Sequence, residues 1–136
     1  MSKANLKKIP AYTLQELLVV LVIIGILILL ALPSLMPLIS KTKSLEAQMQ
    51  LKHLYTLQRS HFMLHSKYSF ELDDIGFEHE KTINQGGNAN YQIEIVEASP
   101  SGFLARATAL ADFDGDGNIN VWEIDEEQSL REVLKD

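Results

Sequence analysis

One uninterrupted run of apolar residues near the start of the chain limits the fold more than any other feature. Leu17 to Leu32 contains no polar side chain, and further apolar residues extend the run past Pro33 to Ile39. As a helix at about 1.5 Å per residue, Leu17 to Ile39 spans roughly 30 Å, the thickness of a bilayer core. The apolar part of a cleaved secretory signal is usually only about 7 to 15 residues long. We therefore predict a helix that spans a membrane once.

The charges on the two sides of this run predict its orientation. Residues 1–10 contain Lys3, Lys7 and Lys8 and no acidic residue, which favours a cytoplasmic amino-terminal end and an external remainder. The whole chain has a formal net charge of −6 and a pI near 5.2. Binding to phosphates depends on clustered Lys and Arg, so nucleic acid is not expected as the main partner. The sequence has no cysteine, which excludes disulfides, thiolate metal sites and a cysteine nucleophile.

Glu16 is the one charged residue at the entrance of the apolar run. A carboxylate inside lipid costs on the order of 2 kcal/mol or more, and less near the headgroups. Two interpretations remain open. Glu16 is either an acid of the first helical turn, where the helix dipole favours negative charge, or a carboxylate that requires an ammonium partner.

The residues around Glu16 carry a family resemblance. The stretch KKIPAYTLQELLVV, residues 7–20, resembles the leader and cleavage site of type IV pilins and type II secretion pseudopilins. The family pattern is a short basic leader, a small residue before the cut, an aromatic residue after it, Thr-Leu-x-Glu, and an apolar helix with a proline about twenty residues on. Pro33 matches that proline. The family usually has Gly before the cut, whereas this chain has Ala11.

The resemblance implies a role for each part of this segment. A prepilin peptidase would remove the leader, residues 1–11, by cutting between Ala11 and Tyr12, and the new amino terminus would be methylated. Residues 12–40 would form the transmembrane and polymerisation helix. In a filament, the Glu16 carboxylate of one subunit would pair with the Tyr12 amine of its neighbour and set the register. The implied location is the bacterial inner membrane with the head in the periplasm, and the filament lies in the periplasm or at the cell surface. The implied partners are other copies of the chain, the peptidase and the inner-membrane assembly machinery.

The remainder, residues 41–136, is predicted to form a small globular head. Lys41 to Ser66 alternates apolar and polar residues at helical spacing, which predicts that the same helix continues with an amphipathic second half. Its apolar stripe, expected to be core, consists of Leu45, Met49, Leu51, Leu54, Leu57, Phe62 and Leu64. The stretch from Ser66 to Asn90 is rich in turn residues and is predicted to be a loop.

Period-two alternation predicts strands after the loop. Tyr91–Ile95 and Phe103–Thr108 are expected to form a hairpin, with Asn120–Ile124 as a third strand and Gln128–Leu134 as a short terminal helix. The predicted fold is therefore α+β, a long amino-terminal helix packed on a small antiparallel sheet, as in pilins.

The strongest local motif lies in residues 112–123, where the sequence DFDGDGNINVWE satisfies D-x-D-x-D-G-x-I-x-x-x-E. It resembles an EF-hand-type calcium loop, and calcium prefers six to eight hard oxygen ligands. The flanking residues are strand-like, so we expect a structural clamp between strands and not a sensor that moves helices. The predicted ligands are the carboxylates of Asp112, Asp114 and Asp116, the backbone carbonyl of Asn118, a water-mediated oxygen at Asn120 and both carboxylate oxygens of Glu123.

No set of residues indicates an enzyme. Three of the four histidines lie on the predicted helix, no Ser-His-Asp arrangement has supporting context, and the clustered acids are assigned to the ion. His61 and His65 are spaced to share one helix face, but two histidines without a third ligand nearby are more often half-exposed surface residues.

Two functions remain open from the sequence. The first is a structural subunit of a type IV pilus-like filament or of a type II secretion pseudopilus, with a head stabilised by calcium. The second is a single-span, membrane-anchored extracytoplasmic calcium-binding module that does not polymerise.

Overall fold

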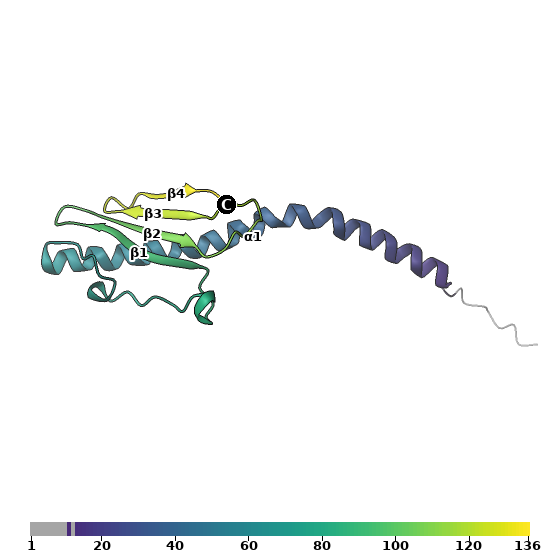
Figure 1. The fold of residues 1–136 in the computed structure, drawn as a ribbon, viewed down its shortest axis with the longest axis horizontal. Coiled ribbons are helices and arrows are strands. Elements are labelled where there is room, and N and C mark those ends of the chain that lie inside the picture. The colour runs from purple at the N-terminus through teal and green to yellow at the C-terminus, as the bar shows by residue number, and fades with distance from the viewer. Residues whose placement is uncertain (1–10, 12) are drawn as a thin grey trace, which may run out of the picture. The chain divides into compact units, whose positions relative to one another are not determined.

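The computed structural model describes residue 11 and residues 13–136, so Tyr12 and residues 1–10 of the predicted leader lie outside the described residues. The chain divides into two compact units, one ending at Leu35 and the other comprising Met36–Asp136. Figure 1 shows one long helix followed by four strands. The predicted α+β fold is confirmed.

The helix α1 extends over Leu14–His65, as the sequence predicted. Every residue from Thr13 to Ile39 is exposed, although nearly all side chains from Leu17 onward are apolar. By length and composition α1 can cross a membrane, since about 20 apolar residues are enough. This part of α1 therefore presents an apolar surface with no protein covering it in the described chain.

The second half of α1 packs against the sheet through a narrow stripe. The buried residues recur every three or four positions and are Ser40, Ser44, Ala47, Leu51, Leu54 and Gln58. Four of these six are small or polar. The Ser44 hydroxyl donates to the Lys41 carbonyl of its own helix at 2.8 Å, which satisfies it without a partner from the sheet.

This stripe corrects the predicted core. Leu51 and Leu54 are buried as expected, but Leu45, Met49 and Leu64 are 52%, 70% and 81% exposed. At 100° per residue, Leu45 and Met49 point away from the stripe and so from the sheet. The buried face therefore combines Leu51 and Leu54 with small or polar residues that the apolar pattern did not indicate.

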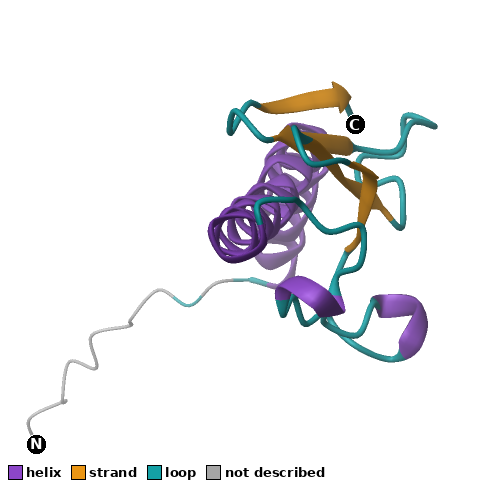
Figure 2. Cartoon of the chain, turned by 90° about the vertical axis from the view of Figure 1, so that its left-hand side faces the viewer, coloured by secondary structure: helices purple, strands orange, loops and turns teal. Residues whose placement is uncertain are grey.

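The sheet is an antiparallel meander in the order β1-β2-β3-β4. Figure 2 shows it on one side of the helix. The predicted hairpin and third strand are confirmed within a few residues. The strands are β1 Tyr91–Ala98, β2 Phe103–Ala109, β3 Val121–Asp125 and β4 Leu130–Leu134.

The predicted terminal helix over Gln128–Leu134 is wrong. β4 pairs with β3 instead, after a turn in which Gln128 has φ 62°. The Asp125 side chain closes this turn by accepting from the N–H groups of Glu127 and Ser129, both at 3.0 Å. Leu, Arg and Glu are good helix formers, but helix propensities differ by less than about 1 kcal/mol per residue, and pairing with the edge of β3 overrides that preference.

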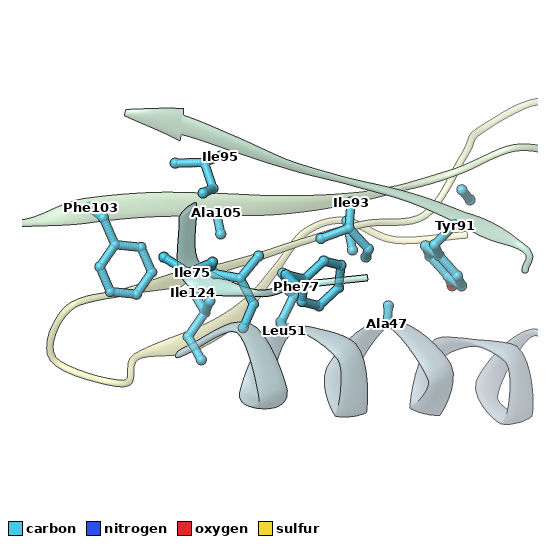
Figure 3. Packing of buried hydrophobic residues seen from close by; sticks show 13 residues of the cluster. Ala47, Leu51, Ile75, Phe77, Tyr91, Ile93, Ile95, Phe103, Ala105 and Ile124 are labelled. Atoms are coloured by element: carbon cyan, nitrogen blue, oxygen red, sulfur yellow. The ribbon is translucent and has the colours of Figure 1, made fainter. Parts of the chain in front are cut away.

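The core lies between the buried stripe of α1 and one face of the sheet (Figure 3). Along β2 every second residue is buried, from Phe103 to Ala109, and the alanines leave room for the helix. Phe77 and Ile75 from the loop fill the space beside Leu51. The loop is thus part of the core and not a loose connection.

Gln58 fixes the start of this loop. Its side chain is fully buried, donates to the Ser69 carbonyl at 2.6 Å and accepts from the Ser69 N–H at 3.0 Å.

We expect Gln58→Ala to lower the free energy of unfolding by about 1–3 kcal/mol, because it leaves both backbone groups of Ser69 without their partner. Denaturation of the full chain in detergent, followed by circular dichroism, measures the change.

Gln50→Ala is the matched control. Gln50 lies on the same helix and is half-buried, so its replacement should change the free energy of unfolding by about 0.5 kcal/mol or less. Equal losses in the two variants would contradict a specific role for Gln58.

Candidate functional site

The amino-terminal end of α1 is closed by a reciprocal cap. The Thr13 N–H donates to Glu16 Oε2 at 2.9 Å, and the Glu16 N–H donates to Thr13 Oγ1 at 3.3 Å. This is a capping box, in which two backbone donors at a helix start are satisfied by side chains. The spacing Thr-x-x-Glu is the sequence signature of a capping box, in addition to being part of the pilin pattern. Glu16 therefore has a structural role within its own chain, in the first turn where the helix dipole favours it.

The structure describes two of the three other residues assigned to processing and assembly. Ala11 is exposed and Tyr12 lies outside the described residues. Pro33 lies within α1, which continues through it as one helix.

The aspartate loop, residues 112–120, joins β2 to β3. Backbone N–H groups of the loop donate hydrogen bonds to its own carboxylates. The Asp112 side chain accepts from the N–H groups of Gly115 and Gly117 at 2.7 and 2.6 Å, and Asp116 accepts from Asn118 N–H at 2.8 Å. Gly115 and Gly117 have φ 81° and 92°, a region that side chains with a Cβ rarely adopt. The glycines of the motif thus permit the turns that gather the acids.

Four carboxylates converge in this loop. Asp112, Asp114, Asp116 and Asp136 each offer an oxygen, and these oxygens all lie within 4.8 Å of one another. Asp136 is the member that sequence reasoning missed, since it follows β4 and is distant in sequence. It is held by Ser40 Oγ and by the Phe113 N–H, which both donate to its Oδ2 at 3.1 Å. Its Oδ1 is buried and has no hydrogen-bond partner among the residues that the structure describes.

The structure places two predicted ligands elsewhere. Glu123 Oε1 accepts from Arg106 Nε and Nη2 at 2.9 and 2.7 Å, and its Oε2 lies 3.5 Å from Arg131. The Asn120 side chain is buried, where its Oδ1 accepts from the Tyr91 hydroxyl at 2.8 Å. These side chains link strands and are not brought to the carboxylate cluster. The contact between Arg106 and Glu123 could be predicted only from the strand register, because the two residues are direct cross-strand partners.

Two carboxyl groups of the loop have pKa values that are shifted in opposite directions. The N–H groups of Gly117 and Gly115 hold the pKa of Asp112 below its usual value. The Asp116 N–H also lowers the pKa of Asp114, but desolvation and the negative charges of Asp116 and Asp136 outweigh it, so that pKa is raised. A raised carboxyl pKa means that the ionised form is disfavoured by its neighbours. A bound cation would remove this repulsion.

The cluster fits a calcium ion by distance and by chemistry. Calcium lies about 2.3–2.6 Å from its oxygen ligands, so two oxygens on opposite sides of one ion are separated by roughly 5 Å. A set of oxygens that all lie within 4.8 Å of one another can therefore share one ion. Hard carboxylate oxygens are the ligands that calcium prefers.

Comparison with known proteins gives one informative match. No protein-family model matches the chain. Over 70 residues the chain is 41% identical to the type IV major pilin protein PilA of Myxococcus xanthus (strain DK1622). The match covers 52% of this chain and 32% of PilA, so the chain spans about a third of the length of that relative. The match agrees with the pilin resemblance of residues 7–20 and supports a pilin relationship.

Proposed function

We propose that this chain is a structural subunit of a type IV pilus-like filament and has no catalytic role. The observation that carries the proposal is the 41% identity to a type IV major pilin. Between the two machines that the sequence left open, this relative favours the pilus over the type II secretion pseudopilus.

The exposed surface of α1 supports self-assembly. From Leu14 to Ile39 the helix has no covering protein in the described chain, so lipid would surround it before assembly and other helices would surround it in a filament. The apolar surface continues into the head, because Leu38, Leu45 and Met49 lie on one face at a spacing of seven and four residues, opposite the sheet. A helix with apolar residues on both faces is typical of one that is buried among partners.

The proposed function includes the maturation of the subunit and its location in the cell. A prepilin peptidase cuts between Ala11 and Tyr12, and the inner-membrane assembly machinery adds the mature subunit to the filament. The head lies on the periplasmic side, because the lysines of the leader favour the cytoplasm. The helix holds the subunit in the inner membrane until assembly.

Calcium is proposed as the structural cofactor of the head. Asp112, Asp114, Asp116 and Asp136 would hold the ion, with the Asn118 carbonyl as a further oxygen ligand. When bound, the two positive charges of the ion offset half of the negative charge of four carboxylates that otherwise repel one another. The residues themselves connect three parts of the head, since Asp136 contacts α1 at Ser40 and the loop at Phe113.

The experiment that tests the function is the analysis of filaments sheared from cells of the source organism. We expect mass spectrometry and amino-terminal sequencing to find this chain in the filament fraction, beginning with methylated Tyr12. A chain found only in membranes and still beginning with Met1 would contradict the proposal. That result would favour the alternative, an anchored calcium-binding module that does not polymerise.

A further inference from the structure

We propose that His61 and His65, on the last turn of α1, form a surface binding site for a divalent transition metal such as Zn²⁺. The two imidazole rings lie 4.4 Å apart between their centroids. This site is separate from the aspartate loop and does not depend on the proposed filament function.

The hydrogen bond of His61 fixes its tautomer. Its Nδ1 lies 2.9 Å from the carbonyl oxygen of Lys67. A carbonyl oxygen only accepts hydrogen bonds, so Nδ1 carries the proton and donates it. The neutral ring then has its lone pair on Nε2. Metal-binding histidines commonly have this arrangement, in which the second ring nitrogen donates to a backbone carbonyl that fixes the tautomer and the ring orientation. His61 is therefore prepared to bind a metal through Nε2.

His65 is positioned to share an ion with His61. It lies four residues after His61, the spacing at which two histidines on one helix face bind a common zinc ion. The side chain of His65 is exposed, so its ring can rotate without disturbing the core. At a zinc–nitrogen distance of about 2.0–2.1 Å, two nitrogens on one tetrahedral ion are roughly 3.3 Å apart, which rings as close as these can reach. The remaining positions on the ion would be filled by water.

The surroundings add negative charge. The two histidines line a shallow hollow whose other wall is formed by the segment that begins at Lys67 and includes Glu71 and Asp74. Lys67 opposes the cation, whereas the two carboxylates favour it. The balance near the rings is one negative charge, which favours a divalent cation over an anion.

The other two histidines are placed differently. His79 uses both nitrogens, because Nε2 accepts from the Ile93 N–H at 2.8 Å and Nδ1 lies 2.6 Å from the Glu80 carbonyl oxygen. His53 lies against Phe77, with the ring centroids 5.8 Å apart, and is two turns of helix away from His61. Of the four histidines, only His61 and His65 lie side by side in the described chain.

Metal binding would tie two segments together. α1 ends at His65, and the Lys67 carbonyl that orients His61 belongs to the chain leaving the helix. An ion on both rings would therefore hold the last turn closed and fix the exit of the loop. It would do so near the Gln58–Ser69 contact that anchors the same loop.

Zinc titration of the full chain in detergent tests the site. The buffer contains 10 mM calcium, which occupies the hard oxygen ligands of the aspartate loop and leaves the imidazoles free. We expect one zinc equivalent to bind the unchanged chain, and His65→Ala to weaken binding by roughly 10- to 100-fold or more, at least as much as the loss of a supporting partner in other metal sites. His53→Ala is the matched control on the same helix and should bind zinc like the unchanged chain.

Nitrogen-detected NMR of the imidazoles provides a second readout. The zinc-free chain should show His61 with its proton on Nδ1, and zinc should shift the signals of His61 and His65 while leaving those of His79 in place. The proposal is overturned if the unchanged chain binds no zinc, if His65→Ala binds it equally well, or if His61 carries its proton on Nε2.

Discussion

Glu16→Gln is expected to insert into the membrane normally and to form no filaments. Glutamine at this position can still accept the Thr13 N–H through its side-chain oxygen, so the capping box that the structure shows is retained. Only the negative charge is lost. If Glu16 pairs with the amine of Tyr12 on a neighbouring subunit, removing one partner of that buried pair destabilises each contact by about 3–5 kcal/mol. The assembly constant then falls by more than a hundredfold, and electron microscopy of sheared filaments measures the loss.

Two further variants, Thr13→Ala and Glu16→Ala, distinguish the effect of the Glu16 charge from that of the helix cap. Thr13→Ala removes the hydroxyl that accepts the Glu16 N–H and should weaken the helix start by about 0.5–2 kcal/mol. It keeps the carboxylate, so filaments should still form. Glu16→Ala removes both functions and should fail to assemble. Normal filaments from Glu16→Gln together with none from Thr13→Ala would show that Glu16 acts only as a helix cap.

The long helix was predictable because its signals are local. An apolar run of this length, followed by residues of good helix propensity, leaves few alternatives. The end at His65 was also predicted, since turn residues follow. The side of the helix that faces the sheet was not predictable, because Ser40, Ser44 and Gln58 are buried for reasons that lie in the partner. Gln58 is buried because Ser69 offers it two hydrogen bonds, a contact that no helical pattern shows.

In the aspartate loop, too, only part of the arrangement was predictable from the sequence. The glycines and the three aspartates of the motif converge as their spacing indicates. Asp136 joins the carboxylate cluster and the predicted ligand Glu123 does not, because the positions of both side chains depend on strand pairing. β3 turns the Glu123 side chain toward Arg106, and β4, predicted as a helix, carries the chain back so that Asp136 reaches the loop. A single wrong secondary-structure assignment therefore concealed the fourth carboxylate.

Calcium is expected to raise the melting temperature of the full chain in detergent by roughly 6 to 22 °C. Extracellular calcium modules bind with dissociation constants of about 10⁻⁴–10⁻³ M. At 10 mM calcium, a ligand that binds only the folded state adds about 1.4–2.7 kcal/mol, and 1 kcal/mol shifts the melting temperature of a small domain by about 4–8 °C. Chelation with EDTA should reverse the rise, which differential scanning calorimetry measures.

Four variants distinguish the ligand set that the structure brings together from the one that the motif predicts. Asp114→Asn and Asp136→Asn should both abolish most of the rise, because each removes a carboxylate from the cluster. Glu123→Gln should lower the melting temperature without calcium, since it weakens the contacts with Arg106 and Arg131, yet the rise with calcium should persist. Asp125→Asn, outside the cluster, is the control for the loss of one negative charge. A rise that disappears in Glu123→Gln and survives in Asp136→Asn would mean that the loop rearranges around calcium into the EF-hand arrangement, with Glu123 released from the arginines to bind the ion.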